Sequence, residues 1–378
     1  MRARDHAAEV SHPREVCQPR LLDLPEQMPT VPQPGKGRSW VLFGALAGLL
    51  IAGLLASAAI GQINLPIAEI VGSICRHMGL ECGAPASRAY GDGAVWNVRL
   101  PRVVLGALVG AALAAAGAVS QGVFGNPLAD PGIIGVSSGA AVGASLAIIT
   151  GVSSLSAFAI PGFAFVTGVI VSFLVYTMAR SRGRTEVVTL ILTGVAVNAV
   201  AGAGLAFMTF AATANQREQI VFWQMGSLNG ALWSQVGTIV PVAVLGLAAA
   251  MTLCTRLDLL ALGEDAARHL GVDIEKLRIA AIIVVAVLTA AAVAFAGVIG
   301  FVGLVIPHLI RMVAGPSHRI LIPASALGGA VMLTVADMVA RTAVAYAELP
   351  IGMLTALVGG PFFFYLLKRT REMNGGWL

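Results

Sequence analysis

Three ionisable side chains fall inside otherwise apolar stretches and are the first candidates for chemistry in this sequence. Asp337 and Arg341 are four residues apart, so on a helix they share a face and can form an ion pair. Charged groups at membrane depth either satisfy one another or mark a transport pathway, and both interpretations of Arg341 stay open. For His308, which follows Pro307, we expect a hydrogen-bonded structural role rather than haem ligation.

Motifs that would power or catalyse a reaction do not occur in the sequence. Residues 35–39 (Gly-Lys-Gly-Arg-Ser) lack the spacing of a nucleotide-binding Walker A loop, and there is no HExxH pattern or nucleophile elbow. Cys17, Cys75, Cys82 and Cys254 include no CxxC pair of the kind that favours a metal site. Cys75 and Cys82 share one predicted outer loop, as a disulfide or as two free thiols. We expect no catalytic site and no bound metal.

Two polar segments interrupt the apolar sequence. Residues 126–131 read Asn-Pro-Leu-Ala-Asp-Pro, and their prolines predict a tight break between two helices. Farther on, Gly263 and Gly271 bound a predicted short helix in a loop at about residues 256–277. This helix is either a solvated connector or a docking element for a cytoplasmic partner.

The predicted short helix has two faces of different character. Its polar face consists of Glu264, Asp265 and Arg268, its apolar face of Ala266, Ala267 and Leu270, and His269 completes the segment. Another short polar segment, Arg-Leu-Pro-Arg, places Arg99 and Arg102 at the start of an apolar stretch. These two arginines either extend toward lipid phosphate or pair with an acidic partner.

The elements that must position these residues follow from composition. Hydrophobic residues make up 57% of the 378 residues and charged residues only 11%, against about a quarter charged in soluble domains. Too few charges exist to cover a water-exposed surface, so lipid must solvate much of the chain. The net charge of +5 is not gathered in a patch, which argues against nucleic-acid binding.

Apolar runs predict an all-α, polytopic membrane protein with about ten spanning helices. The runs lie near residues 39–61, 102–124, 132–150, 157–179, 187–210, 233–255, 278–298, 301–314, 320–343 and 350–367, the eighth being short for a full span. Glycines at four-residue spacing, Gly106 with Gly110 and Gly135 with Gly139 and Gly143, predict close helix packing.

The distribution of basic residues predicts the orientation of these helices. Of the 24 lysines and arginines, 14 fall in or beside loops on the side of the amino terminus and six fall on the other side. The remaining four are arginines of the amino-terminal tail. The positive-inside rule then places both termini in the cytoplasm. Residues 1–37 are polar and proline-rich, and we expect a disordered cytoplasmic tail there, followed by a transmembrane domain over residues 38–378.

Several long motifs resemble the permease subunits of type II ABC importers for iron-siderophores, haem and cobalamin, the FecCD-type family. They are RLPR at Arg99–Arg102, GAALAAAGAVSQGVFGNPLADPGIIGVSSGAAVG at Gly110–Gly143, LGEDAARHLGV at Leu262–Val272, GFVGLVIPHLIR at Gly300–Arg311, ADMVAR at Ala336–Arg341 and ELPIGMLTALVGGPFFFYLLKR at Glu348–Arg369. The likeness covers nearly everything after residue 40, in order.

The resemblance implies a homodimer in the bacterial inner membrane with a translocation path between its subunits. Two cytoplasmic ATPase subunits, carrying ATP and Mg²⁺, would grip a coupling helix at Gly263–Gly271. A periplasmic substrate-binding protein would dock on Arg99, Arg102 and Arg341. Asn126 and Leu128 would contribute to a cytoplasmic gate. The family's second gate segment matches poorly around residues 186–188, so no residue is assigned there.

The cargo implied by the resemblance is haem. Trp96 with Asn97 and the stretches 193–198 and 222–228 look most like the haem-importing branch, with a ferric siderophore or cobalamin as the alternative. A secondary transporter driven by an ion gradient would instead need buried carboxylates that bind Na⁺ or H⁺, and Asp337 is the one inside a clear predicted span. An intramembrane enzyme is disfavoured because no catalytic constellation is present.

Overall fold

The computed structural model describes residues 36–61, 65–80, 83–85, 87, 91–181 and 184–373. Residues 1–35 of the predicted tail lie outside this part of the chain, whereas residues 36 and 37 belong to the first helix. Elements in chain order are α1 (Lys36–Ala59), α2 (Ile67–His77), α3 (Gly91–Gly93), the π-helical η1 (Ala94–Arg99), α4 (Leu100–Val123), the 3₁₀ turn η2 (Pro131–Ile134), α5 (Val136–Ile149), the 3₁₀ turn η3 (Val152–Ser154), α6 (Ala159–Ala179), β1 (Arg180–Ser181), β2 (Arg184–Thr185), α7 (Val187–Ala211), α8 (Ala214–Met225), α9 (Trp233–Leu260), α10 (Glu264–His269), α11 (Ile274–Ala296), α12 (Val302–Ala314), α13 (His318–Thr342) and α14 (Ile351–Met373).

The predicted all-helical membrane architecture is confirmed. Among the described residues, seven helices are long and apolar enough to cross a membrane, and α5, α12 and α14 contribute shorter apolar stretches. These segments coincide with the apolar runs of the sequence, including the short eighth run. That run is short because residues 297–301 are not helical and Phe301 has a left-handed backbone with φ 68°. The small sheet formed by β1 and β2 is an antiparallel hairpin.

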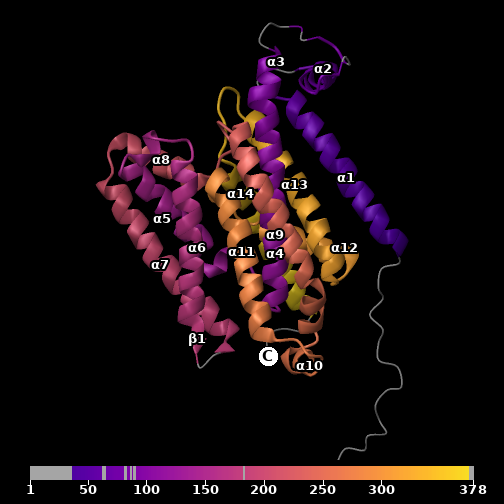
Figure 1. Cartoon of the computed structure of the whole chain (residues 1–378), viewed down its shortest axis with the longest axis vertical. Helices are drawn as coiled ribbons and strands as arrows, with labels where there is room; N and C mark the ends of the chain where they lie inside the picture. The colour runs from indigo at the N-terminus through magenta and orange to yellow at the C-terminus, as the bar shows by residue number, and fades with distance from the viewer. Residues whose placement is uncertain are drawn as a thin grey trace, which may run out of the picture. The chain divides into compact units, whose positions relative to one another are not determined.

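The centre of the fold is α4. Of the residues in its most apolar stretch, 78% are buried inside the protein. Helices α9, α11, α12 and α13 pack around it, with α1 along one side (Figure 1). A Cβ atom at Gly110 would overlap the carbonyl oxygen of Gly329 on α13, and one at Gly117 would overlap that of Gly303 on α12. Backbones meet this closely because lipid supplies no hydrophobic drive for helix association, which then depends on tight packing of small residues.

Helices α5, α6, α7 and α8 form a second group, at the left of Figure 1. Gly139 and Gly143 of α5 face Val171, Thr167 and Phe163 of α6 at distances that leave no room for a side chain. Helix α11 packs on α4 and α9 of the first group and on α5 and α6 of the second. It therefore joins the two groups, and 72% of the residues in its most apolar stretch are buried.

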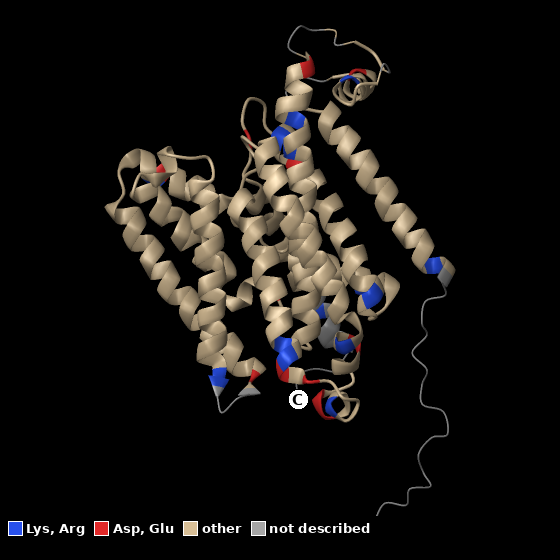
Figure 2. Cartoon of the chain, viewed as in Figure 1, with Lys and Arg blue, Asp and Glu red and all other residues tan. Residues whose placement is uncertain are grey.

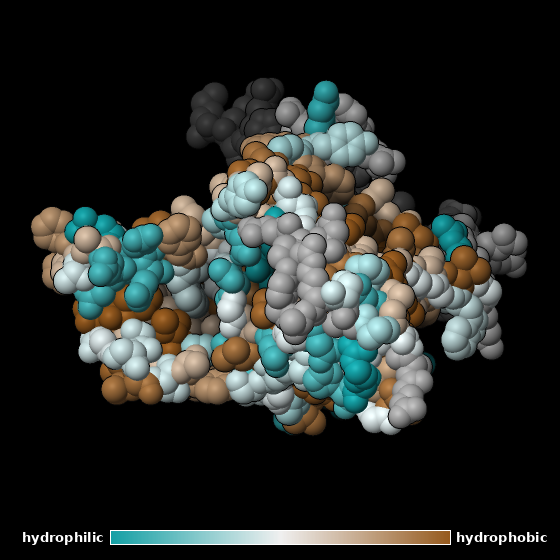
Figure 3. Space-filling view, turned by 90° about the horizontal axis from the view of Figure 1, so that it is seen from above, coloured by the Kyte–Doolittle hydropathy of each residue, from teal (hydrophilic) through white to brown (hydrophobic). Residues whose placement is uncertain are grey.

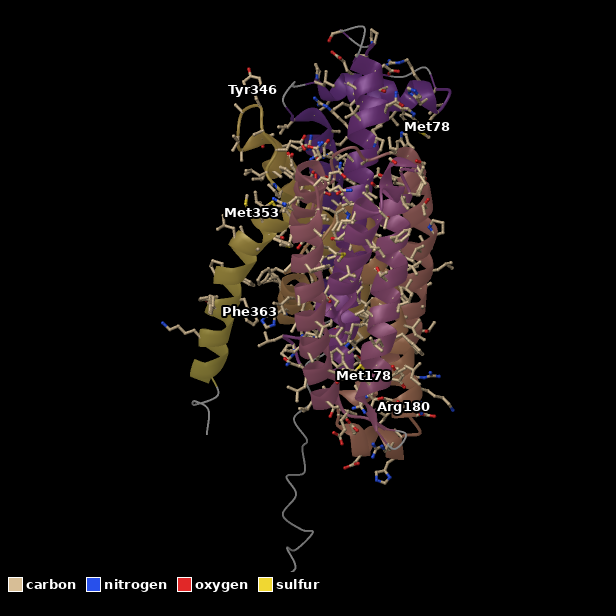
Figure 4. All side chains as sticks on the ribbon, turned by 90° about the vertical axis from the view of Figure 1, so that its left-hand side faces the viewer. Met78, Met178, Arg180, Tyr346, Met353 and Phe363 are labelled. Atoms are coloured by element: carbon tan, nitrogen blue, oxygen red, sulfur yellow. The ribbon has the colours of Figure 1, made fainter. Side chains whose placement is uncertain are left out.

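Charged residues gather toward the two ends of the molecule and leave a band without them in between (Figure 2). We call the end with α2, α3 and α8 the outer end and the end with β1, β2 and α10 the inner end, after the predicted orientation. Tyr346 and Met78 lie at the outer end, and Met178 and Arg180 at the inner end (Figure 4). Cys75 on α2 is disulfide-bonded, whereas Cys82 lies outside the described residues.

Candidate functional site

The arginines predicted for docking come together at the outer end, around one buried carboxylate. Asp337 on α13 accepts from Arg102 Nε through Oδ1 at 3.0 Å and from Arg341 Nε through Oδ2 at 3.0 Å. Both arginine side chains are only 8% exposed. The expected pairing of Asp337 with Arg341 is confirmed, and Arg102 joins it from a position 235 residues away in the chain.

Two of these arginines also bind the carboxyl end of α1. Arg99 donates through Nη1 to the carbonyls of Ala58 at 2.6 Å and Ala59 at 3.1 Å. Arg341 donates through Nη2 to the Ser57 carbonyl at 3.0 Å and its hydroxyl at 2.7 Å. The last carbonyls of a helix lack intrahelical donors and attract cations. These bonds give Arg99 and Arg341 a structural reason to lie at the outer end, where the positive-inside rule disfavours arginine. These contacts are within the protein.

Glu348 gives this arginine cluster its link to the surface. Arg102 Nη1 donates to both Glu348 oxygens, at 3.0 and 3.1 Å, and the Glu348 side chain is 32% exposed. Glu348 lies in the loop between α13 and α14, where Tyr346 is 95% exposed. Figure 3 looks down on this end and shows hydrophilic and hydrophobic side chains side by side. Of the three outer arginines, Arg99 is half-buried, whereas Arg102 and Arg341 are buried.

Aromatic rings line the same end of the molecule. The rings of His77 and Trp96 stack with centroids 4.0 Å apart and planes 8° apart. Trp233 lies 5.3 Å from Trp96 between centroids and donates through Nε1 to the Trp96 carbonyl at 2.8 Å. Such amphipathic rings are typical of the membrane–water interface. The sequence singled out Trp96 but gave no signal of its partners, which come from other helices.

The predicted break at residues 126–131 is present at the inner end. Asn126 Oδ1 accepts from Leu128 N at 2.9 Å, a local turn that holds the segment after α4. Asp130 caps η2 by accepting from Gly132 N at 2.7 Å. Burial raises the pKa of Asp130 above its ordinary value, and the hydrogen bond from Gly132 opposes that rise. Asn126 is exposed and Leu128 half-buried.

Three buried or partly buried polar contacts between helices were missed by sequence reasoning. Arg311 Nη1 donates to Gln121 Oε1 at 2.9 Å, and Gln121 Nε2 donates to the Leu304 carbonyl at 3.1 Å, joining α4 to α12. His318 Nδ1 lies 2.6 Å from Asp258 Oδ1 and joins α13 to α9. Asp258 is thus a second carboxylate within an apolar helix. The only available signal was each residue's polarity at the end of an apolar run.

His308 departs from its expected role. Its Nδ1 atom is buried and has no hydrogen-bond partner in the described part of the chain, so the expectation of a hydrogen-bonded ring is wrong at this atom. Across the described residues, no group of three or more His, Cys, Asp or Glu side chains is placed to hold a metal ion.

The predicted short helix is α10, bounded by Gly263 with φ 107° and Gly271 with φ 83°. Both angles suit glycine, because other residues are strained there. The predicted apolar face is only partly buried: Ala267 is fully buried, but Ala266 is exposed and Leu270 is 58% exposed. The predicted apolar face is not buried as a whole, because α10 is short and only Ala267 packs against the rest of the protein.

The chain is similar to a known family of transport proteins. The model of the FecCD transport family matches residues 49–369. The chain is 46% identical over 280 residues to a cobalamin import system permease protein, BtuC of Halobacterium salinarum, covering 74% of each chain. It is 44% identical over 290 residues to a hemin transport system permease protein, HmuU of Yersinia pestis, covering 75% of this chain and 85% of that one.

A solved structure supports the same comparison. An inward-facing conformation of a metal-chelate type ABC transporter superposes with a TM-score of 0.76 at 35% identity, covering 87% of this chain and 99% of the other. Residues 49–369, which the family model matches, include the outer arginines, the 126–131 turn and α10.

Proposed function

The chain belongs to the FecCD transport family and is a permease of an ABC importer for metal chelates, haem or cobalamin, and we propose that its cargo is haem or a related iron chelate. The cargo proposal rests on the resemblance of Trp96 with Asn97 and of the stretches 193–198 and 222–228 to the haem-importing branch, together with the 44% identity to the hemin permease of Yersinia pestis. The cobalamin permease of Halobacterium salinarum is similarly close, so cobalamin is the competing cargo. Haem is a flat, amphipathic molecule, and an apolar path suits it.

The path in this proposal lies between two copies of the chain, on the side formed by α7. Only 17% of the residues in the most apolar stretch of α7 are buried within one chain. Phe207 and Phe210 are 70% and 82% exposed. On α14, Met353 and Leu357 are exposed as well (Figure 4). Weak apolar contacts along such a path allow cargo to leave, because recognition belongs to the periplasmic binding protein.

The energy in this proposal comes from two ATPase subunits that grip α10 on the cytoplasmic side, where both termini of the chain also lie. An ABC permease requires ATPase and substrate-binding partners, and α10 offers exposed Leu262 and Leu270 beside Glu264 and Arg268. ATP-driven closure would pull on α10 and open the path alternately to each side. Among Arg99, Arg102 and Arg341, Arg99 is the least buried and would attract acidic residues of the binding protein.

A competition experiment tests the cargo. The complete complex in proteoliposomes, with its binding protein, is given labelled haem together with an excess of unlabelled haem, a ferric siderophore or cobalamin. We expect uptake that unlabelled haem suppresses and cobalamin does not. Uptake of labelled cobalamin, with no uptake of haem, would replace haem by cobalamin in the same architecture.

A further inference from the structure

The inner end carries a connection between α10 and α7 that rests on the proposed function of α10 and extends it. A cavity of about 750 Å³ separates the two elements, with Glu264 and Arg268 on one side and residues 185–188 on the other. Helix α10 therefore does not transmit movement to the start of α7 by direct packing across this space. A side chain that reaches both sides is needed.

Arg278 is that side chain. It lies on α11 and is 8% exposed. Its Nη2 atom donates to Glu264 Oε1 at the beginning of α10, and its Nη1 atom donates to the Thr185 carbonyl at 2.7 Å. A planar guanidinium can hold two acceptors that lie in different directions, whereas a lysine ammonium is a compact point charge. Among the described residues, the hydrogen bonds that link α10 to the segment before α7 pass through Arg278.

At the other end of this connection, Thr185 is held by further hydrogen bonds. Thr185 is 2% exposed and donates to Glu275, from Oγ1 to Oε1 at 2.7 Å and from N to Oε2 at 3.1 Å. Tyr176 on α6 donates to the same carboxylate at 2.8 Å. Glu186 follows Thr185 and is the N-cap residue of α7. Movement of Thr185 thus displaces the first turn of α7.

A buried cation keeps its partners because separation leaves a charge without compensation. Glu264 and the Thr185 carbonyl are therefore held to Arg278 when α10 shifts, and the three groups move together. We propose that Arg278 is a positioning residue that transmits displacement of α10 to the first turn of α7. Because the most apolar stretch of α7 is less buried than that of α6, 17% against 28%, and α7 forms the proposed path, this connection joins the ATPase contact to that path.

Hydrogen–deuterium exchange on the full chain in complex with its ATPase subunits tests the connection without knowledge of the cargo. Exchange is compared with and without ATP, Mg²⁺ and vanadate in the wild type and in Arg278→Met, Arg278→Lys and Lys276→Met. Lys276 is the matched control, because its side chain is 81% exposed and pairs only locally with Asp273. Peptides covering residues 262–272 and 185–195 are monitored.

In the wild type and in Lys276→Met, nucleotide should change exchange in both segments. In Arg278→Met the response at 262–272 should persist, while the response at 185–195 should fall about tenfold, in the range typical of coupling between sites. Arg278→Lys, which holds one acceptor at a time, should give an intermediate response and carries the test if the methionine variant does not assemble. Haem taken up per ATP hydrolysed should fall in the same order.

A full response at 185–195 in both Arg278 variants would overturn the connection while leaving α10 as the ATPase contact. A wild-type complex in which nucleotide changes neither segment would instead overturn the proposed role of α10. The two failures are therefore distinguishable.

Discussion

Arg102 Nε lies 3.0 Å from Asp337 Oδ1, and this contact binds α4 to α13 at the outer end of the protein. The carboxylate is 2% exposed and is shared with Arg341. It compensates two cations that also hold the end of α1 and the α13–α14 loop. A single buried charge thus fixes four segments around the surface that we propose for docking.

Asp337→Asn should strongly destabilise the protein, because two buried arginines lose their shared counter-charge. Breaking a buried ion pair on one side costs about 3–5 kcal/mol. Thermal unfolding in detergent measures the loss, and Asp265→Asn is the control, since the Asp265 side chain is 93% exposed. Equal melting temperatures for the two variants would show that the cluster does not hold the outer end together.

Gly110→Ala should also destabilise the fold, because the new Cβ would overlap the carbonyl of Gly329 and separate α4 from α13. Overpacking of this kind costs about 1–3 kcal/mol. Gly202→Ala on α7 is matched, since nothing lies within 4 Å of a Cβ there. Chemical unfolding should separate the variants, and a wild-type midpoint for Gly110→Ala would refute the close approach.

Leu270→Asp should detach the ATPase without affecting the fold, because Leu270 is 58% exposed. Loss of one buried leucine from an interface costs about 1.5–3 kcal/mol, or roughly ten- to a hundredfold in affinity. Co-purification of the ATPase with the permease is the measurement. Leu155→Asp serves as control, since that leucine is 80% exposed near the other end. Normal ATPase capture by the Leu270 variant would exclude α10 as the contact.

Arg99→Glu should weaken binding of the periplasmic protein by about tenfold, which is about 1.4 kcal/mol, and should reduce the salt dependence of the association rate. Surface plasmon resonance at low and high salt measures both effects. Arg217→Glu, a charge reversal at an exposed arginine of the outer end, should bind as the wild type does. Unchanged affinity for Arg99→Glu would move the docking surface elsewhere.

Much of this fold could be predicted from the sequence because lipid forces long apolar helices with few charges. The short eighth span, the turn at Asn126 and the boundaries of α10 at Gly263 and Gly271 all follow from local residue types. Asp337 and Arg341 were found because a four-residue spacing places side chains on one helix face at any depth.

The contacts between distant segments could not be predicted in this way. Arg102 reaches Asp337, and His318 reaches Asp258, across helices whose neighbours are set by tertiary packing that leaves no local pattern. Arg278 appeared as one more basic residue of an inner loop, since nothing in its neighbourhood indicates the Thr185 carbonyl. The exposure of Leu270 likewise depends on how little of α10 the rest of the protein covers.

The most direct test of an ATP-powered permease is haem uptake into proteoliposomes that hold the complete complex and its binding protein but no ion gradient. We predict accumulation that requires ATP inside the compartment corresponding to the cytoplasm and that persists with ionophores present. Uptake that needs a Na⁺ or H⁺ gradient and ignores ATP would contradict this account.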